Sequence, residues 1–527
     1  MSEQAPAAAG GGRRRRGRRR GAADGPGAEG VAAVIEQPPF RQPKLPFPPT
    51  EMLSADELES IHNASLQVLS EIGVDFLHEE AKELLRRAGA EVEAGSDRVR
   101  FDPGLVEETI GRAPAAFDLH SRNPAHRLRF GDGHVTFCAA ASAPNAFDLQ
   151  GGRRPGNRAD YRNFLKLGQM LNAVHMFGGY PVEPIDIHPG VRHLEALQDM
   201  LVMTDKAIHA YSLGRERIVD AIEMTRIARG IDRETLLREP SVLSIINSSS
   251  PLRLDTPMLE GVIQLARHRQ PVVLTPFTLA GAMAPVTIAG ALVQQNAEVL
   301  AGYVLCQAVE PGAPFVYGGF TSNVDMKSGA PAFGTPEAMR AAIIGGQLAR
   351  LYRLPYRSSN VNAANSLDAQ AGYEAVFSLW GAIMGGVNML KHGLGWMEGG
   401  LQTSFEKFVM DADLLQMVAG FLTPVGTSPE DLALDAMREV GPGGHFFGCA
   451  HTRARYKTAF YQPLISDWRN YESWEEAGRP QAPEKANRIY RELVAAYEPP
   501  PMDPAAREEL EAFVARRTEE GGAPTDF

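Results

Sequence analysis

The sequence predicts an α/β fold, a (β/α)₈ TIM barrel with an N-terminal helical subdomain and a C-terminal helical extension. Two observations support this prediction. Short apolar or β-branched runs alternate with longer amphipathic segments from residue 135 onward, and there are eight such runs before residue 394. Strand–helix alternation of this kind gives parallel strands joined by crossover helices. An open, doubly wound sheet is the alternative, because pattern reading can miscount strands.

The eight predicted strands share a short apolar centre and end near polar or aromatic residues. They are Val135–Ala140, Val174–Gly179, Ala207–Leu213, Val242–Asn247, Val272–Pro276, Phe315–Gly319, Pro355–Ser359 and Met389–Gly393. The segments between them have helical periodicity, for example residues 161–171 and 336–352. The barrel domain is therefore predicted over residues 135–425, with a closing helix near 402–420.

Three further regions are predicted outside the barrel. Residues 1–50 are rich in Gly, Ala, Pro and Arg, which is typical of a disordered tail. Residues 51–134 are predicted to form a mainly helical subdomain, and Ser54 with Glu57 forms a capping box at its first helix. A second helix is expected over about 78–89. Residues 426–527 are predicted to be a helical extension, with helices near 483–497 and 503–517.

Composition and charge limit the partners and the compartment. The chain has 527 residues and a net charge of −11, but its first 20 residues contain seven arginines. Removing those seven charges takes the net charge to −18, and an acidic body argues against nucleic acid as a partner. The basic tail could instead steer an acidic protein. Three widely spaced cysteines and the lack of a long apolar run favour a cytoplasmic protein without a membrane partner.

Aromatic residues are frequent where the predicted strands end, and barrel chemistry takes place at that end. Aromatic faces attract an apolar cation by roughly 0.5–2 kcal/mol each. A substrate-binding cage is therefore predicted, and it would favour permanent positive charge; a mouth crowded with lysine and arginine would contradict it. The alternative is that these rings simply cap the barrel core. The candidates are Tyr180, Tyr211, Phe277, Tyr317, Phe320 and Trp396.

Polar candidates at the same end are fewer. His392 is a candidate proton donor or carboxylate anchor, and Ser359 and Asn360 are candidate hydrogen-bond donors to the substrate. Asp325 and Glu398 are candidate groups that contact a cationic centre or activate a group. For the histidine the alternative is a satisfied barrel residue, and for the carboxylates it is a solvated surface position.

Several cofactor and metal motifs are missing from the sequence. It contains no GxGxxG after a first strand, no phosphate-binding GxxxxGK[ST] loop and no HExxH pair. Asp186-Ile187-His188 matches the start of a corrinoid-binding D-x-H-x-x-G motif, but Val191 stands where the glycine is required. We therefore expect no cofactor and no metal ion to be bound by this chain.

Several separate blocks of the sequence form a recognisable set. The blocks are Ser142–Asn145 with Asp148 and Gly152–Pro155, Gly318–Gly329, Asp368–Glu374, Gly395–Leu401, Ser404–Phe408 and Gly444–Arg453. Together they resemble the trimethylamine methyltransferase superfamily, and the similarity covers roughly residues 50–495. The resemblance implies a TIM-barrel methyltransferase that moves a methyl group from a methylated amine to the Co(I) of a separate, cognate corrinoid protein. The cobalt corrinoid is then supplied by that partner protein.

One departure from the family narrows the expected substrate. Founding members carry pyrrolysine in the barrel, but the corresponding region here is the Ser358–Asn365 loop, which has none. Members without pyrrolysine include glycine betaine methyltransferases, so the resemblance favours a quaternary amine such as a betaine. Its nitrogen is already cationic and needs no activating acid. Trimethylamine, another methylated amine or a sulfonium is the alternative donor, and a non-catalytic amine-binding barrel is a third reading. A homo-oligomer is left open.

Overall fold

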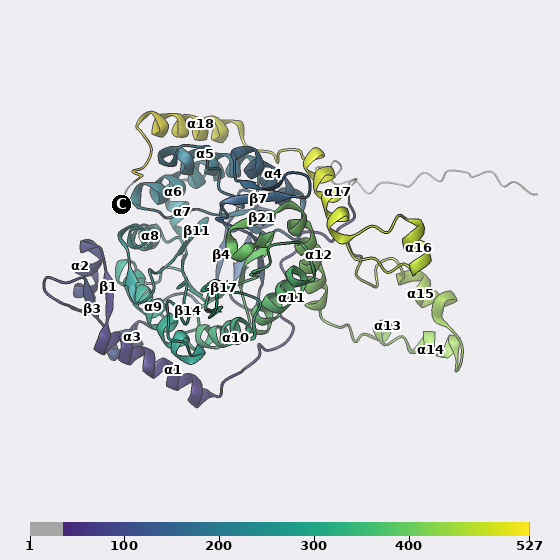
Figure 1. The fold of residues 1–527 in the computed structure, drawn as a ribbon, viewed down its shortest axis with the longest axis horizontal. Coiled ribbons are helices and arrows are strands. Elements are labelled where there is room, and N and C mark those ends of the chain that lie inside the picture. The colour runs from purple at the N-terminus through teal and green to yellow at the C-terminus, as the bar shows by residue number, and fades with distance from the viewer. Residues whose placement is uncertain (1–34, 526–527) are drawn as a thin grey trace, which may run out of the picture.

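The computed structural model describes residues 35–525, and its centre is a closed barrel of eight parallel strands (Figure 1). The hydrogen-bonded order around the barrel is β10-β11-β13-β15-β18-β19-β6-β9. Every barrel strand coincides with one of the eight predicted strands, so the predicted fold is confirmed and the open sheet is excluded. The strands are β6 (Thr136–Ala139), β9 (Met176–Phe177), β10 (Ala207–His209), β11 (Val242–Ile246), β13 (Val272–Leu274), β15 (Phe315–Gly318), β18 (Tyr356–Ser359) and β19 (Met389–Leu394).

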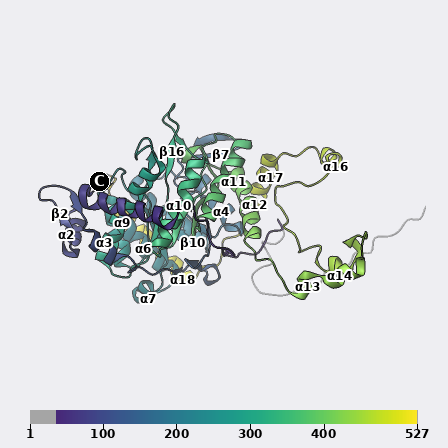
Figure 2. The ribbon, with the colours of Figure 1, turned by 90° about the horizontal axis from the view of Figure 1, so that it is seen from below.

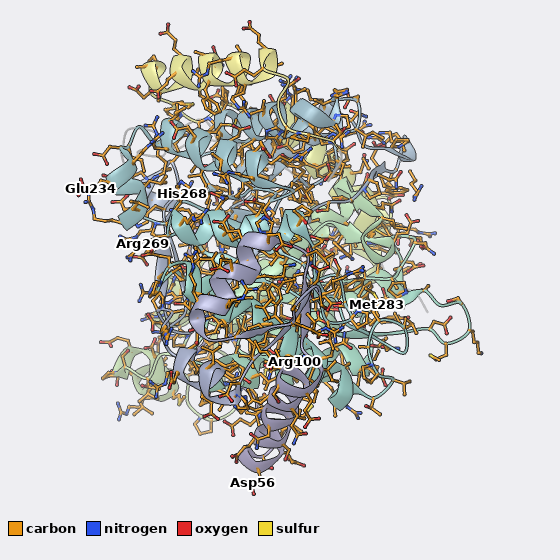
Figure 3. All side chains as sticks on the ribbon, turned by 90° about the vertical axis from the view of Figure 1, so that its left-hand side faces the viewer. Asp56, Arg100, Glu234, His268, Arg269 and Met283 are labelled. Carbon is orange, nitrogen blue, oxygen red and sulfur yellow. The ribbon has the colours of Figure 1, made fainter. Side chains whose placement is uncertain are left out.

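Helices surround the barrel, as crossover connections between parallel strands require. They are α4 (Arg158–Met170), α5 (Pro189–Met203), α6 (Arg215–Arg229), α7 (Arg233–Arg238), α8 (Thr256–Arg267), α9 (Ile288–Val309), α10 (Pro336–Leu351), α11 (Ala369–Met384) and α12 (Phe405–Phe421). Figure 3 separates the two ends of the barrel. Glu234, His268 and Arg269, which precede strands β11 and β13, lie toward one end, and Met283, which follows β13, lies toward the other.

The N-terminal subdomain covers α9 on one side of the barrel. Helix α1 (Ala55–Gln67) begins with the predicted Ser54–Glu57 capping box, and α2 (Glu79–Ala88) matches the second predicted helix. A π-helix, η1 (Val68–Ile72), and helix α3 (Pro103–Thr109) complete the helical part. The subdomain also contains strands of two or three residues, too short to show an alternating pattern in the sequence. They are β1 (Val74–Phe76), β2 (Glu91–Val92) and β3 (Arg98–Arg100), with β12 (Arg253–Leu254) added to β1.

The N-terminal end of the barrel is closed by a hairpin of β4 (Phe117–Leu119) and β5 (Leu128–Phe130). Its buried apolar side chains pack against residues such as Met176, Leu243 and Val316 inside the barrel. Among the residues that the structure describes, the interior therefore opens toward the carboxyl ends of the strands, which we call the mouth.

Residues 35–50 correct the predicted extent of the disordered tail. The backbone N–H of Leu45 donates to Gly133 at 2.9 Å, and Gln42 Nε2 donates to Thr136 Oγ1 at 2.8 Å. Phe40 packs against the cluster at the closed end. These apolar and amide contacts fix the segment on the barrel although its composition resembles a linker. The arginine run lies outside the described residues.

Two small sheets form the rim of the mouth (Figure 2). One contains β7 (Asn145–Asp148), β8 (Gly152–Pro155), β20 (Trp396–Met397) and β21 (Gln402–Ser404), and the other contains β14 (Leu279–Ala280), β16 (Ser322–Val324) and β17 (Pro331–Ala332). Their strands are short, and the sequence does not predict them. They hold the loops that follow the barrel strands.

The C-terminal region is helical, and part of it projects from the barrel (Figure 1). Helices α17 (Ala482–Ala495) and α18 (Pro504–Glu519) lie near the predicted positions; α17 packs on α12, and α18 packs across α5 and α6. The projecting part contains α13 (Pro429–Leu432), α14 (Leu434–Val440), η4 (Phe446–Gly448), α15 (Ala450–Arg455) and α16 (Tyr471–Glu476). Within residues 35–525, no helix combines the length and apolar character that a bilayer crossing needs.

Candidate active site

A cavity of about 560 Å³ lies at the mouth of the barrel. This volume is in the range of small-molecule sites, and the mouth is where barrel enzymes carry their chemistry. Residues at or just after seven of the eight strands line it, all but β13, together with side chains of α5 and α6. The lining includes Ser142, Tyr180, Glu183, Arg192, His209, Tyr211, Arg217, Asn247, Phe320, Arg357, Lys391, His392 and Trp396.

Four of the six predicted aromatic residues line this cavity, in two groups. Tyr180 and Tyr211 meet edge to face, with ring centroids 4.6 Å apart. The rings of His392 and Trp396 lie 3.9 Å apart, and Phe320 lies 5.9 Å from His392. Because each group comes from different strands, aromatic surface faces the cavity from more than one side.

The other two predicted aromatic residues lie outside the cavity lining. Phe277 is in a second layer, with its ring centroid 4.8 Å from that of Phe320. Tyr317 is fully buried on the outside of the barrel, where its hydroxyl donates to Asn296 of α9 at 3.1 Å. Side chains alternate along a strand, so a residue that follows the inward-facing Val316 must face the helices.

Two predicted polar contacts also lie outside the cavity lining. Ser359 borders a smaller neighbouring pocket. Asn360 is fully buried, and its Nδ2 donates to the carbonyl of Gly393 at 3.2 Å. Asn360 therefore joins β18 to β19 at the edge of the mouth, and neither side chain lines the main cavity.

Of the three predicted catalytic residues, only His392 lines the cavity. Asp325 is exposed in the turn between β16 and β17, where its carboxylate accepts hydrogen bonds from Lys327 and Ser328. These bonds hold the pKa of Asp325 below its usual range. Glu398 pairs with Arg153 on the rim, at 2.7 Å. Both carboxylates therefore have structural partners outside the cavity lining, and the structure does not bring them to the cavity with His392.

Two buried cationic side chains line the cavity, and the sequence did not single them out. Lys391 is 4% exposed and Arg357 is 2% exposed. Burial, with Arg357 nearby, lowers the pKa of Lys391 to about 7, and burial lowers the pKa of Arg357 to about 10. The Arg357 guanidinium stands 4.8 Å from the ring centroid of Phe320, so one face of that ring already holds a cation.

Charges of both signs complete the lining. Arg192 and Arg217 add positive charge from α5 and α6. Glu183 adds a carboxyl group, and burial raises its pKa to about 7. The sequence predicts a cavity that favours permanent positive charge and is not crowded with lysine and arginine. The structure corrects this, because cationic side chains outnumber the carboxylate around the aromatic rings.

Several buried donors of the lining have no hydrogen-bond partner within residues 35–525. They include Arg357 Nε, Trp396 Nε1 and His209 Nδ1. His209 Nε2 accepts the backbone N–H of Ile245 at 2.9 Å, so a neutral ring carries its proton on Nδ1. Burial lowers the pKa of His209, which favours this neutral form. Unpaired buried donors are costly, and their concentration at one cavity indicates a ligand that accepts hydrogen bonds.

The backbone of His392 is unusual for a strand. Strand β19 shifts register between Leu390 and Leu394, and His392 has a φ of +56°. A left-handed residue other than glycine costs of order 1–3 kcal/mol, and such residues cluster at functional sites. The bulge places Lys391 and His392, which are consecutive, on the same cavity, whereas a regular strand would send them to opposite faces.

The incomplete corrinoid motif has a structural role. Asp186 accepts the backbone N–H of Arg158 at 2.8 Å, and His188 Nδ1 accepts the backbone N–H of Gly190 at the start of α5. Both side chains therefore act as helix caps. Within the described residues, no group of three or more potential metal ligands comes together.

Comparison with known proteins identifies the family. The model of the trimethylamine methyltransferase (MTTB) family matches residues 13–522. The chain belongs to this family. Among its relatives, a glycine betaine methyltransferase of Desulfitobacterium hafniense strain Y51 is 36% identical over 90% of this chain and 99% of its own. The trimethylamine methyltransferase MttB2 of Methanosarcina mazei is 27% identical over 88% of this chain and 94% of its own.

Membership establishes the general activity. The chain is a member of the corrinoid-dependent amine methyltransferases, in which a methyl group passes from a methylated amine or betaine to a separate corrinoid protein. The enzyme therefore needs a site for the methyl donor that also admits a second protein to the donated methyl. The mouth of a barrel closed at its other end meets both needs.

Proposed function

We propose that this enzyme demethylates a zwitterionic quaternary amine, a betaine, and passes the methyl group to its cognate corrinoid protein. The observation that carries the proposal is the pairing, in one cavity, of buried cationic donors with aromatic rings. Lys391 and Arg357 suit a carboxylate, and Tyr180, Tyr211 and Trp396 suit a trimethylammonium group.

The lining distinguishes a betaine from a simple amine. A bare cation such as trimethylammonium would meet Arg357 and Lys391 without any compensating charge of its own. A carboxylate on the same molecule accepts hydrogen bonds from these residues and from the unpaired His209 Nδ1. Because buried ions are expensive unless paired, the cationic lining favours a ligand that carries both charges.

The same arrangement suits the chemistry. In the proposed step one N–CH₃ bond breaks, its electron pair stays on nitrogen, and the methyl group forms a bond to the acceptor of the partner protein. The nitrogen leaves as a neutral tertiary amine, so no acid has to protonate it. The side chains of this chain need only hold the carboxylate, face the ammonium with rings and exclude water.

Similarity to the glycine betaine methyltransferase supports this choice of substrate, since 36% of positions are identical over nearly the whole of both chains. The trimethylamine methyltransferases are more distant, at 27–29% in the three relatives MttB2 of M. mazei, MttB of D. hafniense DCB-2 and MttB of M. barkeri Fusaro. Glycine betaine is therefore the first donor to test.

The deciding experiment follows the loss of Co(I) absorbance in a reduced corrinoid protein after addition of the enzyme and one methyl donor. We expect methylation with glycine betaine and none with trimethylamine. Choline serves as the matched donor without a carboxylate, and we expect it to react at least tenfold more slowly. Equal rates with choline and glycine betaine would contradict a carboxylate-binding role for the cationic lining.

Calorimetric binding separates recognition from turnover and needs no corrinoid protein. The probe 3,3-dimethylbutyrate keeps the carboxylate of glycine betaine but has carbon in place of the charged nitrogen. It should bind more weakly than glycine betaine, because it lacks the attraction between the cationic nitrogen and the aromatic rings. Binding of glycine betaine without any methyl transfer to a competent corrinoid protein would favour the non-catalytic reading instead.

A further inference from the structure

Residues 423–480, which we call the arm, leave the barrel after α12 and return at α17 (Figures 1 and 2). The base of the arm is firmly held. Asp413 of α12, 4% exposed, accepts the backbone N–H groups of Leu464 at 2.8 Å and of Ile465 at 3.3 Å, and it also bonds the Tyr461 hydroxyl. These bonds anchor the returning end of the arm to α12.

The arm exposes an unusual amount of apolar surface. Phe447 is 87% exposed, Phe460 77% and Trp468 69%. At least a third of the surface of the other members is also exposed, and the full set is Val425, Leu432, Leu434, Met437, Phe446, Phe447, Tyr456, Phe460, Trp468 and Tyr471. At these fractions the arm presents roughly 1,000 Å² to solvent, given that one aromatic side chain can bury about 150–250 Å². The largest patch on a typical monomer is about 300–600 Å².

A second apolar surface lies beside the base of the arm, on the outer sides of α11 and α12. Trp380 and Phe421 contact each other, with ring centroids 5.0 Å apart, and Tyr373 is 61% exposed. We call this surface the α11–α12 face; its members are Tyr373, Val376, Phe377, Trp380, Met417 and Phe421. The arm projects away from this face (Figure 1), and each of its six members keeps more than a third of its surface exposed, although Phe47 contacts Phe421 at 5.8 Å between ring centroids.

We propose that the arm of one copy packs on the α11–α12 face of a second copy of this chain, in a two-fold dimer. Two-fold symmetry makes each contact twice, so both exposed surfaces of both chains are covered by one operation. Together they would bury about 2,000 Å² or more, at or above the roughly 1,200–2,000 Å² of stable interfaces. An interface of this area is typical of a stable complex rather than of a transient encounter.

The corrinoid protein fits this surface less well. It must reach the mouth and leave again in each turnover, and transient encounters use smaller, more polar surfaces. The arm stands at the side of the barrel, and α13 and α14 lie toward the end opposite β7 and β16, which border the mouth (Figure 2). A dimer through the arms leaves both mouths open for the methyl acceptor.

Sedimentation of the full chain over a wide concentration range tests the proposal. We expect a dimer for the wild type and at least a hundredfold higher dissociation constant for the double variant Phe447→Ser with Phe460→Ser. The matched control is Met326→Ser, which removes a side chain 72% exposed in the β16–β17 turn and should leave the dimer unchanged. A wild-type monomer at all concentrations, or a double variant that dimerises as tightly, would overturn the proposal.

Cross-linking tests the pairing itself and does not depend on the double variant folding. Two single variants, Phe460→Cys on the arm and Trp380→Cys on the α11–α12 face, are mixed and treated with a thiol cross-linker; the three native cysteines are buried. Cross-linked heterodimers are expected from the mixture, and far fewer from either variant alone. An assembly that forms without this cross-link would refute the arm-to-face contact. So would a monomer whose arm is protected only when the corrinoid protein is added.

Discussion

Two buried lysines show how the two ends of the barrel differ. Lys206 precedes β10 at the closed end, and Lys391 lies in β19 at the mouth; both are at most 4% exposed, and burial lowers the pKa of each to about 7. Lys206 Nζ donates to the carbonyls of Gly168 and Leu171, each at 2.7 Å, with Asp205 as a favourable charge. Lys391 Nζ donates to one carbonyl, that of Gly178, and has Arg357 as a like charge.

The two lysines are buried for different reasons: one is paired within the fold, and the other faces a ligand cavity. At the closed end the fold itself supplies acceptors and a counter-charge, so Lys206 needs no ligand. At the mouth the fold brings the positive charge of Arg357 toward Lys391, and both side chains line the cavity. Such an arrangement is unfavourable in the empty enzyme and becomes favourable when an anion enters. Replacing each lysine in turn therefore gives a matched pair of variants, one at the mouth and one at the closed end.

The largest expected effect comes from removing one lysine at a time. Lys391→Met should lower the affinity for glycine betaine by about 10- to 100-fold. A hydrogen bond to a charged group contributes about 1.5–3 kcal/mol, and each 1.4 kcal/mol is tenfold in affinity. Titration calorimetry measures the change. Lys206→Met should bind glycine betaine within about twofold of the wild type, and comparable losses in both variants would show that the two ends do not differ in function.

The pH dependence should sharpen the same contrast. Lys391 loses its proton as the pH rises through about 7, so its attraction for a carboxylate is present below that pH and disappears above it. Betaine affinity should fall by up to about tenfold per pH unit above 7, and binding at pH 8 should take up a proton. Calorimetry in two buffers of different ionisation enthalpy measures that proton.

Glu183 titrates in the same range and needs its own control. Burial raises its pKa to about 7, so it gains negative charge as the pH rises and then opposes a carboxylate as well. Proton uptake that persists in Lys391→Met and vanishes in Glu183→Gln would assign the pH dependence to the carboxyl group. Uptake that vanishes in Lys391→Met and persists in Lys206→Met fits the proposal.

A smaller effect is expected at the aromatic wall. Tyr211→Leu should weaken glycine betaine binding by about 2- to 30-fold, the range that corresponds to a cation–aromatic contribution of roughly 0.5–2 kcal/mol. Binding of 3,3-dimethylbutyrate, measured in parallel, should change less. Tyr317→Phe is the control, because this tyrosine faces α9 outside the cavity. An equal loss of affinity for both ligands would show that Tyr211 does not recognise the positive charge.

The sequence predicts the barrel well because each barrel strand is an apolar run next to a helical segment. Aromatic residues chosen because they follow a strand, such as Tyr180 and Trp396, line the cavity, and their contact with a substrate stays a prediction. Tyr317 does not line the cavity, because it lies within strand β15. Val316 faces the barrel interior, so the next side chain along the strand faces the helices. Counting alternate residues from the buried interior would have placed it among the helices.

The charged half of the site was harder to predict. Arg357 and Lys391 lie inside predicted strands, and a charge within a buried strand is a usable signal, since such residues are rarely buried without a reason. The bulge that brings Lys391 and His392 to one side is invisible in the sequence. Glu183 and Arg192 lie on a loop and on α5, and their place in the cavity depends on packing between segments distant in the chain.

The smallest expected effect concerns Asp325, which the sequence places among the catalytic candidates and the structure places in an exposed turn. Asp325→Asn should leave the rate with glycine betaine within about twofold of the wild type, because its hydrogen bonds are to Lys327 and Ser328 of its own turn. Stability should change little, because the turn is exposed and water replaces a hydrogen bond that is lost there. Steady-state assay of Co(I) methylation checks the rate. A tenfold loss would mean that the β16–β17 turn folds over the mouth during turnover, and the cavity lining would then have to include it.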